Sequence, residues 1–141
     1  MGPVVADHGI KVDLDVSDAK ETELAVARER AEALFGERKY FAAERWYKEV
    51  IRIHERDDRA WARLGVIAVT QKRYDAGTTA LQKSIKINPN VASRYYNLAL
   101  AYYLQEDREE AIKAIDRAIQ LSPDRANYLE LKVRIAALKG D

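Results

Sequence analysis

The residue types that most often carry out chemistry are scarce in this chain. It has two histidines, His8 and His54, and no cysteine, so thiol nucleophiles, disulfides and cysteine zinc sites are excluded. His54 lies in the run His-Glu-Arg-Asp-Asp, which lacks the second histidine of a helical zinc-protease motif. Glycine-rich phosphate loops and the GxSxG nucleophile elbow are also absent from the sequence. We therefore expect no catalytic residue, no metal site and no cofactor.

Carboxylates are plentiful, but their spacing suits a helix start better than an acid/base pair. Glu106 and Asp107 stand just before Glu109 and Glu110. Acidic residues in the first turn of a helix complement the helix dipole, which explains such a cluster without catalysis. The sequence therefore predicts a protein that is not an enzyme.

Composition favours a helical domain without affinity for nucleic acid. A length of 141 residues suggests one domain, and 48% hydrophobic residues with only 6 Gly and 3 Pro favour helices over a many-stranded sandwich. The 24 Lys and Arg residues against 23 Asp and Glu residues give a net charge of +1, which leaves no general excess of positive charge for phosphate backbones.

No apolar run approaches the roughly 18 residues of a membrane span, and residues 1–23 lack the apolar stretch of a secretory signal. We therefore expect a cytoplasmic protein that does not insert into membranes. The opening Met1-Gly2-Pro3 is equally compatible with a replaced signal or anchor, which leaves a periplasmic or membrane-anchored parent open.

A spacing of 34 residues relates three parts of the chain. At this offset Trp61 aligns with Tyr95 and Pro89 aligns with Pro123 without gaps, and a fainter copy lies one step further back. Within each copy, apolar residues at spacings of three and four predict two helices separated by a polar break. One such pair cannot bury its apolar face alone, so consecutive pairs must stack. The predicted units are residues 24–57, 58–91 and 92–125.

The repeated pattern has an aromatic residue, a leucine and a small residue in the first helix, then a small, a bulky and a small residue and a closing proline. The second unit supplies Trp61, Leu64, Gly65, Gly77, Leu81, Ser84 and Pro89. The third supplies Tyr95, Leu98, Ala99, Tyr102, Ala111, Ile115, Ala118 and Pro123. The chain thus resembles the tetratricopeptide repeat family. The resemblance implies an all-α fold, a right-handed α-solenoid of stacked antiparallel helix pairs.

The two ends of the chain depart from the repeat. Residues 1–23 contain a period-2 alternation and predict an extended or disordered acidic arm, which could also link subunits into a homo-oligomer. Residues 126–141 predict a capping helix or the start of a truncated fourth repeat. The alternation consists of Ile10, Val12, Leu14 and Val16 with Lys11, Asp13 and Asp15 between them.

The resemblance also implies a binding surface, because the first helix of each unit lines a concave groove in this family. Apolar and tyrosine residues on such a surface are typical of a partner site. The alternative is that neighbouring helices cover them. The predicted groove residues are Arg28, Arg63, Val66, Val69, Tyr96, Asn97, Leu100 and Tyr103.

We therefore expect a scaffold or adaptor that binds a peptide segment of a partner protein. The family's best-known ligand, an acidic carboxy-terminal peptide, needs a clamp of which this chain retains only part, since Glu32 reverses one position. The expected segment is mainly apolar, and its possible carboxylate would pair with Arg28 or Arg63. A self-assembling structural protein and a secretion-type chaperone that use the same groove are the alternatives.

Overall fold

The computed structural model describes residues 4–5, 11–12 and 16–139. Among these residues there are seven helices and two strands of two residues each, which confirms the all-α class. Contacts divide the chain into two compact units, Met1–Glu55 and Arg56–Asp141, whereas length alone predicts one domain.

The first unit begins with a short hairpin and a long helix. Strand β1 (Val4–Val5) pairs antiparallel with β2 (Lys11–Val12), and helix α1 (Val16–Gly36) follows. Residues 16–23 are therefore helical, and the predicted arm boundary at residue 23 is wrong. The sequence from Ala19 to Ala25 is rich in helix formers, which favour a helix before residue 24. The remaining residues of the predicted alternation, Ile10, Asp13, Leu14 and Asp15, lie outside the described residues.

Helix α2 (Tyr40–Ile53) packs against α1 to complete the first unit. Its buried residues include Tyr47, whose ring meets the ring of Phe35 on α1 edge-on at a centroid distance of 6.2 Å. Such edge-on aromatic contacts add to the stabilisation from area burial. Small residues let the two helices approach, namely Ala27, Ala31 and Ala43, which are at most 1% exposed.

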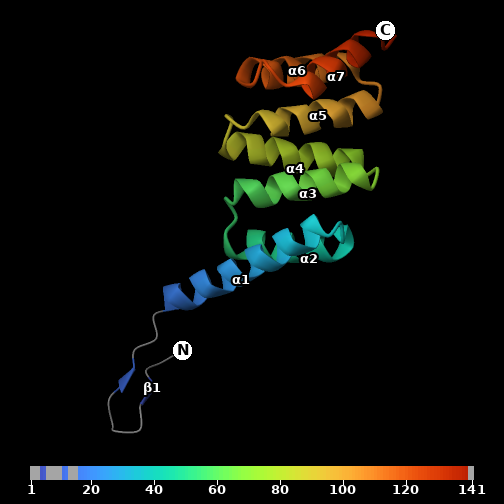
Figure 1. Ribbon diagram of the computed structural model, residues 1–141. Helices are drawn as coiled ribbons and strands as arrows, with labels where there is room; N and C mark the ends of the chain where they lie inside the picture. The colour runs from blue at the N-terminus through green and yellow to red at the C-terminus, as the bar shows by residue number, and fades with distance from the viewer. Residues whose placement is uncertain (1–3, 6–10, 13–15, 140–141) are drawn as a thin grey trace. The chain divides into compact units, whose positions relative to one another are not determined.

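The second unit is a stack of five helices, each packed on the next (Figure 1). Helices α3 and α4 form one antiparallel pair, α5 and α6 form the next, and α7 follows α6. Pro89 and Pro123 lie two residues beyond the ends of α4 and α6, as predicted for helix terminators. The bounds are α3 (Asp58–Thr70), α4 (Tyr74–Ile87), α5 (Ala92–Leu104), α6 (Arg108–Leu121) and α7 (Ala126–Ala136).

The backbone turns repeat as regularly as the sequence does. Arg38, Lys72 and Glu106 are 34 residues apart, and each has a positive φ between 59° and 62°. Each sits in the turn between the two helices of a pair, where the next amide bonds back to the carbonyl five residues earlier, as from Arg73 to Ala68 at 2.8 Å. The left-handed conformation reverses the chain at these points. The first pair therefore shares the turn of the other two despite its weaker sequence match.

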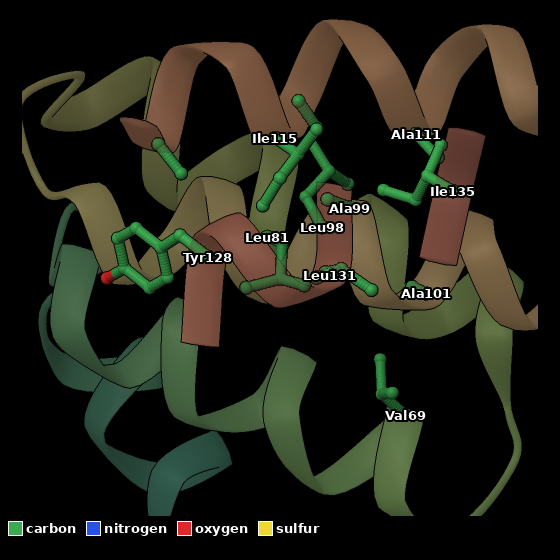
Figure 2. Close-up of a cluster of buried hydrophobic side chains, with 12 residues drawn as sticks. Val69, Leu81, Leu98, Ala99, Ala101, Ala111, Ile115, Tyr128, Leu131 and Ile135 are labelled. Atoms are coloured by element: carbon green, nitrogen blue, oxygen red, sulfur yellow. The ribbon is translucent and has the colours of Figure 1, made fainter. Parts of the chain in front are cut away.

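The core of the second unit is a continuous cluster from α3 to α7 (Figure 2). Leu81, Ile115 and Ile135 are fully buried in it, each on a different helix. Because every helix contributes to one cluster, the pairs are held together by shared burial of apolar surface. This arrangement is an α-solenoid, as the sequence predicts.

Candidate functional site

A pocket of about 270 Å³ lies between α3 and α5. The α3 residues that line it recur at spacings of three and four, so they share one face of that helix. Val91, which precedes α5, also lines the pocket. The lining residues are Arg59, Ala62, Arg63 and Val66 from α3, and Ser93, Arg94 and Asn97 from α5.

The pocket combines positive charge with a small apolar surface. Three of its lining residues are arginines, and none of those eight described residues is acidic. Arginine presents a planar fork of donors that fits the oxygens of a carboxylate or phosphate. Ala62, Val66 and Val91 add apolar contacts beside these donors. The arrangement can thus hold an anionic group attached to an apolar segment.

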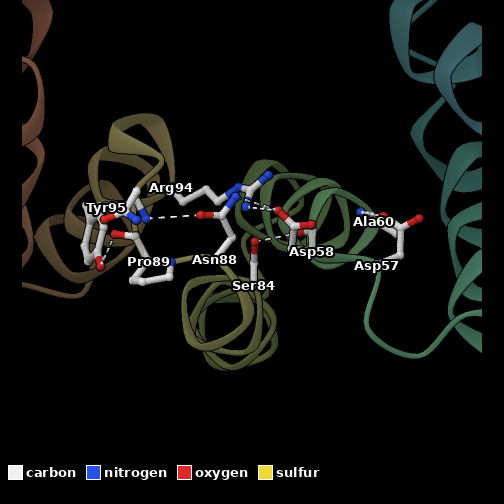
Figure 3. Close-up of polar contacts among 9 residues, drawn as sticks. Asp57, Asp58, Ala60, Ser84, Asn88, Pro89, Arg94 and Tyr95 are labelled. Atoms are coloured by element: carbon white, nitrogen blue, oxygen red, sulfur yellow. Dashed lines mark hydrogen bonds and ion pairs between the residues drawn. The ribbon is translucent and has the colours of Figure 1, made fainter.

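Arg94 is fixed by an ion pair to Asp58, the first residue of α3 (Figure 3). The Arg94 side chain is 10% exposed and that of Asp58 is 30% exposed, so the pair is largely shielded from water. Asn88 donates a weaker hydrogen bond to the same Asp58 carboxylate at 3.4 Å. Ser84 on α4 donates to the backbone carbonyl of Asp58 at 2.7 Å. These bonds tie α3, α4 and α5 together at one end of the pocket.

The ion pair also determines the titration of Asp58. Partial burial raises the pKa of this carboxyl, but the hydrogen bond and the charge of Arg94 together with the Asn88 bond outweigh that effect. The pKa of Asp58 is therefore lowered from its ordinary value. The carboxylate stays charged at neutral pH and keeps Arg94 in place.

The amino-terminal end of α5 opens on the same pocket. No described side chain caps this helix at Val91, unlike α3, where Asp57 accepts a hydrogen bond from the Ala60 amide at 3.0 Å. Ser93 and Arg94 belong to the first turn of α5. The positive end of the helix dipole therefore adds to the charge of the arginines.

The structure brings together part of the predicted groove. Arg63, Val66 and Asn97 all line the pocket. Val69 does not, because it is only 9% exposed and belongs to the core cluster. Gly77 on α4 has no side chain, and this leaves room for Val69 to pack against that helix. The expectation that Val69 faces solvent is therefore wrong.

The predicted aromatic part of the groove is partly covered. Tyr96 stacks on Tyr128 of α7 with ring centroids 5.0 Å apart and planes 23° apart. Leu100 and Tyr103 are partly buried against the core cluster. Tyr96 is thus covered by a neighbouring helix, which was the alternative to an exposed position. The pocket is therefore more polar than the apolar patch expected from the sequence.

Arg28, the remaining predicted groove residue, belongs to the first unit. Its guanidinium Nη2 lies 3.3 Å from Nδ1 of His54, and its side chain is exposed. The pocket between α3 and α5 is formed without it.

Two of the pocket arginines, Arg59 and Arg94, were not among the predicted groove residues. Arg59 stands four residues before Arg63, so helical spacing alone places both on one face of α3. Helical spacing does not indicate a role for Arg94, because its ion-pair partner lies 36 residues earlier in the chain. Ser93, which also lines the pocket, was not among them either.

No group of three or more metal-binding side chains is found in the part of the chain that the structure describes. None of the described helices is both long and apolar enough to cross a bilayer.

Two family models, each described as a tetratricopeptide repeat, match this chain at residues 58–91 and 92–125. These are the ranges of the second and third units drawn from the 34-residue spacing. Among curated proteins, BBSome complex member BBS4 of Bos taurus is 29% identical over 136 residues, and the alignment covers 91% of this chain and 25% of that protein. The chain therefore spans about a quarter of the length of this relative.

Solved structures with the same fold include the first TPR domain of Spaghetti (RPAP3) bound to the HSP90 peptide SRMEEVD. It has a TM-score of 0.77 and 16% identity, and the match covers 82% of this chain and 91% of that one. The complex of the yeast Sti1 TPR2B domain with pHsp70 has a TM-score of 0.76 and 17% identity, with coverages of 84% and 99%. At these identities the likeness shows the fold alone.

Proposed function

Because the chain belongs to the tetratricopeptide repeat family, we propose that it is a scaffold or adaptor that binds a peptide segment of a partner protein. The bound segment lies in the pocket between α3 and α5. The observation that carries this proposal is the lining of the pocket, where Arg63 and Asn97 face the same space as Val66. Polar donors beside a small apolar surface suit a peptide better than a soluble ion.

The ligands of similar structures agree with this class of function. The Spaghetti (RPAP3) domain is bound to an HSP90 peptide, and the yeast Sti1 domain is in a complex with pHsp70. The pocket of this chain is lined by Ser93 and Asn97 of α5 together with the arginines of α3. We infer that the partner segment is mainly apolar and bears one anionic group that pairs with Arg63.

The pocket is preformed, which favours binding. The Asp58–Arg94 pair and the Ser84 hydrogen bond hold its two walls together. A site whose residues are already ordered loses less conformational entropy when a ligand binds. Most of the conformational entropy lost on binding is therefore that of the peptide.

The experiment compares partner capture from native cells by three forms of the full chain. Arg63→Glu reverses a charge inside the pocket, whereas Lys113→Glu reverses an exposed charge on α6 that does not line it. We expect Arg63→Glu to lose partners that the wild type and Lys113→Glu retain, as measured by quantitative mass spectrometry. Equal capture by all three forms, with circular dichroism showing the same fold, would contradict the proposal. Light scattering on the same samples separates partner binding from self-assembly.

A further inference from the structure

We propose that one exposed face of α2 is a second binding surface, which receives a short acidic protein segment that carries a large apolar side chain. This α2 surface consists of Phe41, Ala42, Arg45 and Trp46. It lies on the second helix of the first pair and shares none of the described residues that line the pocket between α3 and α5. The inference therefore goes beyond the proposed function, since it gives the scaffold a second kind of partner.

The α2 surface contains an aromatic ring that the fold leaves in water. Phe41 is 80% exposed. The buried residues of α2 lie on the opposite side of the helix, namely Ala43, Tyr47 and Val50. Removal of a phenylalanine side chain from water is favourable, and aromatic residues are enriched at protein interfaces. Contact with a partner would provide the burial that Phe41 lacks in the free chain.

The other helix pairs do not have an aromatic residue at this position. At the spacing of 34 residues, Phe41 corresponds to Asp75 and Glu109, which are acidic residues in the first turns of α4 and α6. An acidic side chain in the first turn complements the helix dipole, and phenylalanine gives up that contribution. Neither burial nor the helix dipole therefore accounts for Phe41, whereas an apolar contact with a partner does.

A pocket beside Phe41 provides room for a side chain of the partner. Its volume is about 380 Å³, and Ala42 and Trp46 are among its lining residues. At the repeat spacing, Trp46 corresponds to Ala80 and Ala114, which are at most 7% exposed. The first pair therefore has an aromatic wall where the other two pairs have a small buried residue. A leucine or a larger apolar side chain can enter this pocket and contact the ring of Trp46.

The charges around the pocket favour an acidic segment. Arg45 is exposed and makes no hydrogen bond or ion pair with any residue that the structure describes. Glu49 also lines the pocket, but Nε of Arg52 donates to its Oε1 at 3.0 Å. Arg30 adds a second positive charge, 4.8 Å from the ring centroid of Trp46. A carboxylate of the partner can therefore pair with Arg45, whereas a basic segment would be repelled.

The test adds three acetylated and amidated hexapeptides to the full chain. Ala-Asp-Leu-Leu-Asp-Ala has both features of the expected segment, Ala-Asn-Leu-Leu-Asn-Ala lacks the charge, and Ala-Asp-Ala-Ala-Asp-Ala lacks the large apolar side chains. The indole N–H signals of Trp46 and Trp61, the two tryptophans of the chain, report binding by NMR. We expect the first peptide to shift the Trp46 signal saturably and to leave Trp61 on α3 unchanged. The other two peptides should bind at least about tenfold more weakly.

Two pairs of variants give the test its specificity. Phe41→Ala should weaken binding of the first peptide about tenfold, because the ring no longer covers the leucines. Arg45→Gln should weaken it about fivefold and abolish the preference for aspartate over asparagine. Glu109→Ala and Lys113→Gln change the equivalent positions of α6 and should bind as the wild type does. Circular dichroism checks that all four variants keep the fold.

Each component of the inference has an outcome that overturns it. Equal affinities for the aspartate and asparagine peptides would overturn the acidic class of partner, and equal affinity for the alanine peptide would overturn the apolar anchor. Absence of a saturable Trp46 shift at millimolar peptide would overturn the whole inference.

Light scattering tests whether a second copy of the chain occupies the α2 surface instead. A mass that rises with concentration for the wild type but not for Phe41→Ala would assign the surface to self-association and overturn the inference. None of these measurements depends on Arg63, so the proposed function is tested separately by its own experiment.

Discussion

The ammonium group of Lys83 lies 4.4 Å from the ring centroid of Trp61, across the α3–α4 pair. The same contact recurs 34 residues later, where the guanidinium of Arg117 lies 5.8 Å from the ring centroid of Tyr95. A cation over an aromatic face is attracted by the negative potential of the ring. The sequence repeat therefore preserves an electrostatic contact in addition to the apolar positions.

We expect Lys83→Met to lower the free energy of unfolding by about 0.5 to 1 kcal/mol, because methionine keeps the apolar stem but removes the charge above Trp61. Urea denaturation of the full chain measures the change. Lys86→Met removes a nearby exposed charge on α4 and should change stability by less than about 0.5 kcal/mol. Equal losses in the two variants would mean that net charge, and not the ring contact, is responsible.

Asp58→Asn should destabilise the second unit by roughly 2 kcal/mol, since it leaves the buried Arg94 guanidinium without its charged partner. The comparison is Asp116→Asn, which breaks the exposed 2.7 Å pair with Lys132 and should cost less than about 1 kcal/mol. Thermal unfolding followed by circular dichroism measures both. Similar costs would show that the shielding of the Asp58–Arg94 pair has no energetic effect.

The Asp58 pair should also make stability depend on pH in the acid range. The pKa of Asp58 is lowered in the folded chain, so its contribution is complete above the unfolded value of about 3.9 and is lost as pH falls through the folded value. The difference in unfolding free energy between the wild type and Asp58→Asn should therefore stay constant from about pH 7 to pH 5 and shrink below about pH 4. Urea titrations at several pH values test this. A difference that persists unchanged at about pH 2.5 would assign the effect of Asp58 to packing.

Periodicity predicts the helices of the second and third units because each helix must turn the same apolar face to its neighbours. The first unit matches less well for a reason of volume. Trp61 is on the first helix of its pair and the buried Ala80 is on the second, whereas the equivalent positions of the first pair hold Ala27 and Trp46. The tryptophan is therefore on the second helix in the first pair and on the first helix in the second pair. A sequence pattern that expects the aromatic residue on the first helix therefore matches the first unit poorly.

The site is less predictable than the fold. Helical spacing places Val66 and Val69 on neighbouring strips of α3, and it does not reveal which strip α4 covers. Val66 lines the pocket and Val69 enters the core, because Gly77 leaves room for a side chain there. The burial of Arg94 depends on a carboxylate 36 residues away, a distance at which sequence spacing carries no information on contact. Contacts between residues far apart in the sequence therefore determine which side chains line the pocket.

Tyr128 anchors α7 on the stack through its contact with Tyr96, so Tyr128→Ala should lower stability by about 3 kcal/mol. Tyr128 is 2% exposed, whereas Val133 on the same helix is 70% exposed and its replacement by alanine should change stability by less than about 0.5 kcal/mol. Chemical denaturation gives both values. Hydrogen exchange should show faster opening of residues 126–136 in Tyr128→Ala. Unchanged protection there would mean that α7 is held by Leu131 and Ile135 alone.

Gly77→Ala should separate α4 from α3, because an added Cβ would lie 2.6 Å from Cγ2 of Val69 and 3.2 Å from the carbonyl oxygen of Gly65. The backbone oxygen cannot rotate away, so the helices must move apart and we expect a loss of about 1 to 3 kcal/mol. Gly36→Ala is the matched substitution, since nothing lies within 4 Å of its added Cβ. Alanine at this end of α1 should be neutral or should stabilise by up to about 1 kcal/mol, through its higher helix propensity. Guanidinium denaturation of the full chain measures both changes. Equal effects of the two substitutions would show that the close approach of Gly65 and Gly77 does not set the spacing of α3 and α4.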